Sequence, residues 1–93
     1  MQLMNLSDRF TIPTEVMARA VGTEVVILDL ASGTYFGIEA VGARAWEILR
    51  EGHSLGEAVD MLLAEYDVAR PELERDLFRL AGDLVDRGLL KTA

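Results

Sequence analysis

Few residues of this sequence are of the types that carry out chemistry, and none stands in a recognisable catalytic pattern. His53 is the only histidine and the chain has no cysteine, so a zinc site is not expected. Ser7, Ser32 and Ser54 suit an arm, a turn and a helix cap better than the role of a nucleophile, which needs a positioned base. The carboxylates fall in no acid–base or metal-loop motif. The sequence therefore predicts no catalytic residue, no metal site and no cofactor.

The charge of the chain also excludes several kinds of partner. Its net charge of −7 repels phosphate backbones and anionic lipid surfaces. Gly33 and Gly37 lack the lysine and hydroxyl residue of a phosphate-binding loop. The longest apolar run, Val25 to Leu28, is too short to span a bilayer, and Met1 to Asp8 do not have the pattern of a signal peptide. We expect a cytoplasmic protein that binds neither nucleic acid nor membrane.

Three short segments have the composition of an antiparallel β-meander. They are residues 16–21, 24–30 and 34–38, separated by Gly22-Thr23 and by the turn 31–33. Glycine at the first turn position suits a type II′ hairpin. The segment 24–30 is almost continuously apolar and β-branched, which predicts a strand covered on both faces.

After this meander the apolar period changes from 2 to 3.6, which predicts three helices. The first ends near Gly52, and the second begins at Ser54 with a capping box that includes Glu57. The third begins at Pro71 and ends at Arg87-Gly88-Leu89, where glycine suits a left-handed cap. The fold class is therefore α+β, a three-stranded antiparallel sheet followed by three helices, with one face of the sheet packed on the helices.

Residues 1–15 are predicted to form an N-terminal arm, and residues 16–91 the domain. The arm is read as extended and lying on the domain, because its apolar residues are scattered before Pro13. These apolar residues are Leu3, Leu6, Phe10 and Ile12.

Two surfaces of the predicted fold are suited to binding. If the strands pair in sequence order, the third strand lies at the sheet edge, and its residues include no lysine, proline or inward charge to block pairing. Such an edge is used to add a peptide as a further strand, or it is covered by the arm or by a second copy of the chain. The edge residues that we single out are Thr34, Tyr35, Phe36 and Gly37.

The third helix supplies the second surface, because it is apolar over a wider arc than one core stripe requires. Its leucine face holds Leu73, Leu77, Leu80 and Leu84. A second stripe forms either the wall of a groove or more of the core. Its residues are Phe78, Ala81 and Val85, with Glu74 at the margin.

Long stretches of the sequence resemble a known family. The run "VVILDLASGTYFGIEAVGARAWEIL", the "SLGEAV" helix and the ending "RGLL" resemble the PqqD-like family, also called RiPP recognition elements. The resemblance covers residues 16–91 and is most specific from Ser32 to Trp46 and from Arg87 to Leu90. The "SGTYFGI" segment is most similar to the stand-alone members found in lasso-peptide gene clusters.

The resemblance implies a fold and a function. Its members are winged helix-turn-helix-like domains that bind the leader segment of a ribosomally made precursor peptide without catalysis. The leader adds to the third strand, here Thr34 to Gly37, and docks against the third helix, here Pro71 to Arg87. The implied partners are a cysteine protease of transglutaminase-like fold and an ATP-dependent macrolactam synthetase. The peptide-binding residues expected from pattern and resemblance together are Thr34, Tyr35, Phe36, Gly37, Glu74, Phe78, Ala81 and Val85.

Two alternative functions remain open at this point. One is that of a PqqD-type peptide chaperone in pyrroloquinoline quinone biosynthesis. The other is that of a winged-helix transcription regulator, against which the acidic charge and the lack of a basic recognition helix count.

Overall fold

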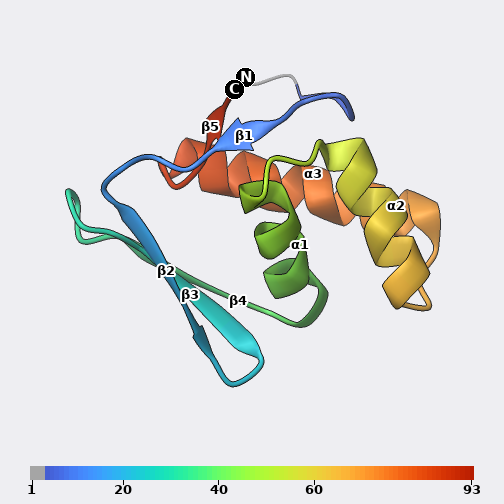
Figure 1. Ribbon diagram of the computed structural model, residues 1–93, viewed down its shortest axis with the longest axis horizontal. Helices are drawn as coiled ribbons and strands as arrows, with labels where there is room; N and C mark the ends of the chain where they lie inside the picture. The colour runs from blue at the N-terminus through green and yellow to red at the C-terminus, as the bar shows by residue number, and fades with distance from the viewer. Residues whose placement is uncertain (1–3) are drawn as a thin grey trace.

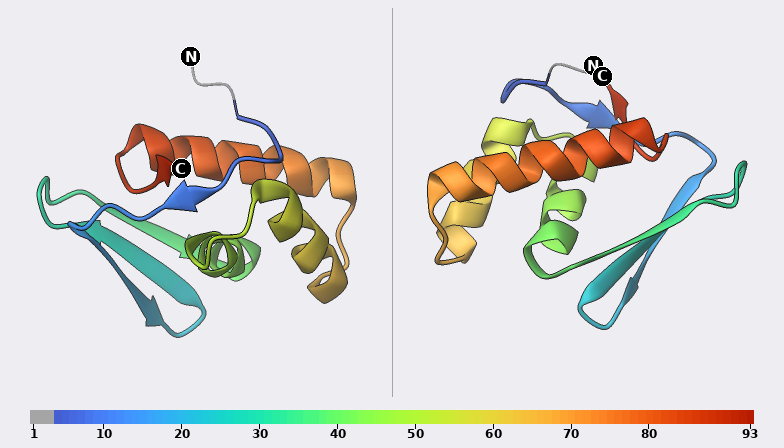
Figure 2. Two further views of the ribbon diagram at one scale, coloured as in Figure 1. Left: turned by 45° about the horizontal axis from the view of Figure 1, so that its top comes forward. Right: turned by 180° about the vertical axis from the view of Figure 1, so that it is seen from behind.

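The structure of the protein is a computed structural model that describes residues 4–93. Its elements follow in the order β1, β2, β3, β4, α1, α2, α3 and β5 (Figure 1). The hairpin of β2 and β3 projects away from the three helices, and the short strands β1 and β5 lie side by side next to α3 (Figure 1, Figure 2). Leu3 of the predicted arm lies outside the described residues. No helix in residues 4–93 is long and apolar enough to cross a membrane.

The meander forms as the sequence predicts. The strands are β2 (Val16–Val21), β3 (Glu24–Asp29) and β4 (Tyr35–Glu39), paired antiparallel in the order β2-β3-β4. Gly22 has a φ of 64°, as the first position of a type II′ turn requires. At the second turn the Gly33 N–H donates to the Asp29 carbonyl over 2.8 Å, with Gly33 at a φ of 75°.

The three helices begin and end at the predicted signals. They are α1 (Ala40–Arg50), α2 (Leu55–Glu65) and α3 (Arg70–Asp86). At the start of α2 the Glu57 N–H donates to Ser54 Oγ over 3.1 Å, and the Ser54 N–H donates to the Glu57 carboxylate over 2.8 Å. The hydrogen bond from the Ser54 N–H, and next the one from Arg9, lower the pKa of the Glu57 carboxyl. The capping box is therefore confirmed.

The end of α3 is a Schellman motif. The Leu89 N–H donates to the Leu84 carbonyl over 2.8 Å, and the Gly88 N–H donates to the Val85 carbonyl over 3.0 Å. Gly88 has a φ of 74°, which costs glycine little. Leu89 and Leu90 are consequently turned back into the core, where both are buried.

The core lies where the three helices meet one face of the sheet. Trp46 of α1 and Ile27 of β3 are among its largest fully buried side chains. Helix α1 packs against β3, β4, α2 and α3, and so connects the sheet to the other helices. Helix α3 contributes Leu73, Leu77, Ala81 and Leu84 to the core.

The prediction that the second strand is covered on both faces is wrong. Val25 and Ile27 are buried against the helices, but Val26 and Leu28 on the other face are only half-buried. Beside them Met17 is 58% exposed, so no second layer covers this face within residues 4–93. A continuous apolar run shows that both faces of a strand are apolar, but it does not show that a further layer packs on each face. On the open face, side chains of the neighbouring strands alone keep Val26 and Leu28 half-buried.

The N-terminal segment docks on the helices and on the C-terminal strand. β1 (Phe10–Thr11) pairs antiparallel with β5 (Lys91–Thr92), and Phe10 is buried. The Gly56 N–H of α2 donates to the Leu6 carbonyl over 2.7 Å, and a Cβ at Gly56 would lie 3.1 Å from that oxygen. Residues 4–15 therefore do not cover the edge of β4, which was one of the two alternatives to peptide binding.

Candidate functional site

The outer edge of β4 offers backbone groups for pairing. In an antiparallel pair, successive residues direct their N–H and C=O groups alternately toward the partner strand and away from it. The Asp29 N–H donates to the Thr34 carbonyl over 2.8 Å, so Thr34 faces β3, and Phe36 and Ile38 do the same by alternation. The N–H and C=O groups of Tyr35 and Gly37 consequently point away from β3, and β4 has no other neighbouring strand within residues 4–93.

The side chains of β4 alternate between two surroundings. Phe36 and Ile38 lie on the helix side of the sheet, whereas Tyr35, which is 72% exposed, lies on the open side. The Arg87 guanidinium at the end of α3 sits 5.0 Å from the centroid of the Phe36 ring, within the range of a cation–π interaction. This contact brings the end of α3 close to the first part of β4.

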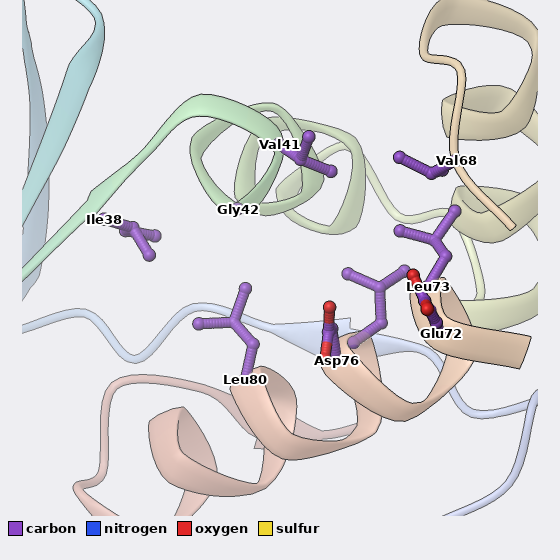
Figure 3. Close-up of a pocket in the computed structure, with 9 residues that line it drawn as sticks. Ile38, Val41, Gly42, Val68, Glu72, Leu73, Asp76 and Leu80 are labelled. Carbon is purple, nitrogen blue, oxygen red and sulfur yellow. The ribbon is translucent and has the colours of Figure 1, made fainter.

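An apolar cleft of about 260 Å³ lies beside the last part of β4 (Figure 3). Ile38 borders it from the strand, Val41 from the start of α1, and Leu80 from α3. Its other lining residues are Gly42, Val68, Glu72, Leu73, Asp76 and Leu77. The cleft is thus bounded by the end of the free strand edge, by α1 and by α3.

The space in the cleft depends on Gly42. A Cβ at this position would lie 3.2 Å from Ile38 Cγ2 and 3.7 Å from Leu80 Cδ2. The first distance is shorter than ordinary van der Waals contact, so any side chain here would press on the cleft wall. The glycine therefore keeps the region between β4 and α3 open.

The turn from β4 into α1 is strained. Ala40 has a φ of 54°, the left-handed region in which a residue with a Cβ costs about 1–2 kcal/mol relative to the usual helical region. Glu39 precedes it as the helix N-cap and makes no side-chain capping hydrogen bond. The abrupt change of direction at Ala40 carries Val41 and Gly42 to the border of the cleft.

Helix α3 has two flanks on either side of its buried face, because each residue advances about 100° around the axis. The flank that faces β4 and the cleft, here called the cleft flank, holds Glu72, Asp76, Leu80, Asp83 and Arg87. The opposite one, the far flank, holds Glu74, Phe78, Gly82 and Val85.

Contacts distinguish the two flanks. On the far flank Glu74 pairs with Arg70 at 3.3 Å, and Arg70 also pairs with Asp60 of α2. Val85 borders a shallow hollow beside β1 and β5. The far flank therefore adjoins α2 and the terminal strands, and not β4.

The structure brings together some of the residues expected at the site and separates others. Tyr35, Phe36 and Gly37 lie on β4, whereas Thr34 lies just before its start, and of these four only Tyr35 and Gly37 direct backbone groups outward. Ala81 is 0% exposed within the core. Glu74, Phe78 and Val85 lie on the far flank, whereas the residues that face the cleft include Ile38, Val41, Gly42 and Leu80, none of which was predicted from the sequence to bind peptide.

The polar groups elsewhere form no comparable site. His53 lies 3.5 Å from Glu57 and 3.9 Å from Glu51 in the exposed connection between α1 and α2. Among residues 4–93, no group of three or more histidine, cysteine or acidic side chains is placed to hold a metal ion.

An uncovered strand edge beside an apolar cleft and a helix flank is the arrangement by which domains bind extended peptides through strand addition. A family model described as "Coenzyme PQQ synthesis protein D (PqqD)" matches residues 24–90, and the chain belongs to this family. The resemblance inferred from the sequence is thereby confirmed.

Two solved structures are similar over nearly the whole chain. One, "TbiB1 in Complex with the TbiA(beta) Leader Peptide", is 44% identical with a TM-score of 0.81, over 87% of this chain and 94% of that one. The other, "Lasso peptide synthetase B1 complexed with the leader peptide", is 29% identical with a TM-score of 0.81, over 89% and 98%. Both support the predicted α+β fold, and a comparison with curated proteins finds no significant match.

Proposed function

We propose that this protein binds the leader segment of a ribosomally made precursor peptide, of the lasso class, and does no chemistry itself. The observation that carries the proposal is the free edge of β4, where Tyr35 and Gly37 direct their backbone groups away from β3 and have no partner strand within residues 4–93. The two similar structures are each described as complexes with a leader peptide, which supports the same function here.

The geometry divides the recognition between backbone and side chains. Main-chain hydrogen bonds to β4 hold any extended peptide, so they give affinity but little sequence discrimination. The cleft between Ile38, Val41 and Leu80 accepts an apolar side chain, and this pocket supplies the discrimination. A peptide on the edge of β4 lies directly beside this pocket.

The bound precursor is then delivered to enzymes that modify it. In the proposed lasso pathway these are a transglutaminase-like cysteine protease, which removes the leader, and a macrolactam synthetase, which closes the ring. The alternative is a PqqD-type peptide chaperone in pyrroloquinoline quinone biosynthesis. The description of the matching family, which names PQQ synthesis, supports this alternative. That function would use the same strand edge with a different peptide.

Calorimetric titration with the TbiA(beta) leader peptide as probe tests the proposal, because the protein that binds it is 44% identical to this chain. We expect saturable binding with a one-to-one stoichiometry, and much weaker binding of a scrambled peptide of the same composition, which retains only the main-chain contacts. Equal binding of the two peptides, or no binding of either, would contradict the proposed function. Cleavage of the leader by this chain alone would contradict the non-catalytic role.

A further inference from the structure

The cleft flank of α3 carries acidic side chains that form no ion pair within the described residues 4–93. Glu72 and Asp76 both line the cleft, and neither has an ion-pair partner within 4.0 Å in the described part of the chain. Asp83 continues the same flank one turn beyond Leu80 and is likewise without an ion-pair partner in residues 4–93. The cleft is therefore apolar inside and negatively charged along one border.

The far flank is different, although it belongs to the same helix. Its acid, Glu74, is held by Arg70, which also reaches Asp60 on α2. The chain has 9 cationic and 16 anionic residues, so it contains too few cations to pair every acid. Among residues 4–93, the acids without an ion-pair partner include Glu72 and Asp76 beside the cleft.

A basic side chain suits this border better than any other type. The aliphatic stem of lysine or arginine packs on apolar surface while its charged end stays at the rim. Figure 3 shows the Asp76 carboxylate rising beside Leu80 at the side of the cleft, with Glu72 next to Leu73. A cation next to an apolar anchor thus meets a carboxylate without having to enter the cleft.

We infer that the peptide bound on β4 carries a lysine or arginine next to the apolar side chain that fills the cleft, and that Glu72 and Asp76 hold this basic residue. The inference rests on the proposed function, and it names a charge requirement in the leader that strand addition alone does not impose. Its consequence is that the groove selects leaders by charge as well as by shape.

A lysine and glutamate scan of the TbiA(beta) leader peptide tests this inference. Each position is replaced in turn by Lys and by Glu, and every peptide is titrated against the wild-type protein at low salt. We expect one position beside the apolar anchor at which the Lys peptide binds about tenfold more tightly than the Glu peptide, in line with exposed ion pairs that involve two carboxylates. The ratio should fall when the salt concentration is raised.

Two double variants of equal net charge then test whether Glu72 and Asp76 cause the preference for the Lys peptide over the Glu peptide. In the double variant Glu72→Gln and Asp76→Asn, the Lys-over-Glu ratio at that position should fall to about twofold or less. The control removes the same charge from two exposed acids away from the cleft, Glu15→Gln and Asp86→Asn, and should keep the ratio. Thermal melts check that both variants are folded.

The outcomes separate this inference from the proposed function. If the unmodified leader binds but no position distinguishes Lys from Glu, or if the ratio survives in the Glu72 and Asp76 variant, the charge requirement is wrong and leader binding stands. If the ratio falls equally in the control variant, the preference comes from the net charge of the protein, which also contradicts the inference. Failure of the unmodified leader to bind contradicts the proposed function itself.

Discussion

The two flanks of α3 both combine acidic and apolar side chains, but they differ in whether these side chains find partners among the described residues. On the far flank the acid is paired, and Phe78 and Val85 pack partly against the core. On the cleft flank the acids have no ion-pair partner among residues 4–93, and Leu80, which also packs partly against the core, borders an open apolar space beside the free edge of β4. A surface whose acids lack ion-pair partners among the described residues and whose apolar side chains border an open cleft is available to a second molecule. The comparison therefore favours the cleft flank as the proposed binding surface.

The largest expected effect separates the flanks directly. Leu80→Ala should weaken binding of the TbiA(beta) leader by about 1–3 kcal/mol, since it removes one wall of the pocket for an apolar anchor. Phe78→Ala on the far flank should lower the free energy of unfolding and leave the affinity of the folded protein within about twofold, because Phe78 packs on the core. A denaturant melt measures the free energy of unfolding of each variant, and calorimetric titration of the folded variant measures its affinity for the leader.

The sequence alone favoured the opposite flank, so this pair of variants decides between the two arrangements. A loss of affinity in folded Phe78→Ala that matches or exceeds that in Leu80→Ala would place the wall of the groove on the far flank. It would also remove the basis for assigning specificity to the cleft.

A smaller effect is expected from filling the cleft. Gly42→Ala should weaken leader binding by about 1 kcal/mol, because the added methyl group would lie 3.2 Å from Ile38 and take space from the anchor. Gly82→Ala on α3 is the matched control, since nothing lies within 4 Å of its added Cβ. It should raise stability by about 0.5–1 kcal/mol through helix propensity and leave affinity unchanged. Unchanged affinity in folded Gly42→Ala would mean that no side chain enters the cleft.

The smallest effect concerns the strained turn that borders the cleft. Ala40→Gly should raise the free energy of unfolding by up to about 1 kcal/mol, because relief of the left-handed backbone outweighs the greater entropy that glycine has in the unfolded chain. Ala64→Gly, at an exposed position of α2, should instead lose about 0.5–1 kcal/mol. Equal destabilisation in the two variants, seen in chemical denaturation, would show that Ala40 is not strained.

The parts of the fold that follow local rules were predictable from the sequence. Gly22 fixes a hairpin turn through its own φ, Ser54 and Glu57 cap α2 within one turn of helix, and Gly88 ends α3 through bonds to residues just before it. Each of these signals acts between residues close in sequence, so the residue types alone carry it.

The parts that depend on distant contacts were not predictable in the same way. The period of α3 gives the angle between Phe78 and Leu80, but which of the two turns toward β4 is set by how the helix docks. The pairing of β1 with β5 joins the two ends of the chain, and short segments without clear alternation give no signal for it. The open face of the sheet beside Met17 was missed because apolar composition does not reveal whether a second layer is present.

The central claim is that a leader peptide pairs with the outer edge of β4, and residue-resolved amide hydrogen exchange tests it most directly. On addition of the TbiA(beta) leader, exchange at the Tyr35 and Gly37 amides should slow markedly, because these N–H groups gain a partner strand. The Phe36 and Ile38 amides, which already face β3, should change much less. Protection confined to the open sheet face around Met17, with Tyr35 and Gly37 unchanged, would contradict strand addition on β4.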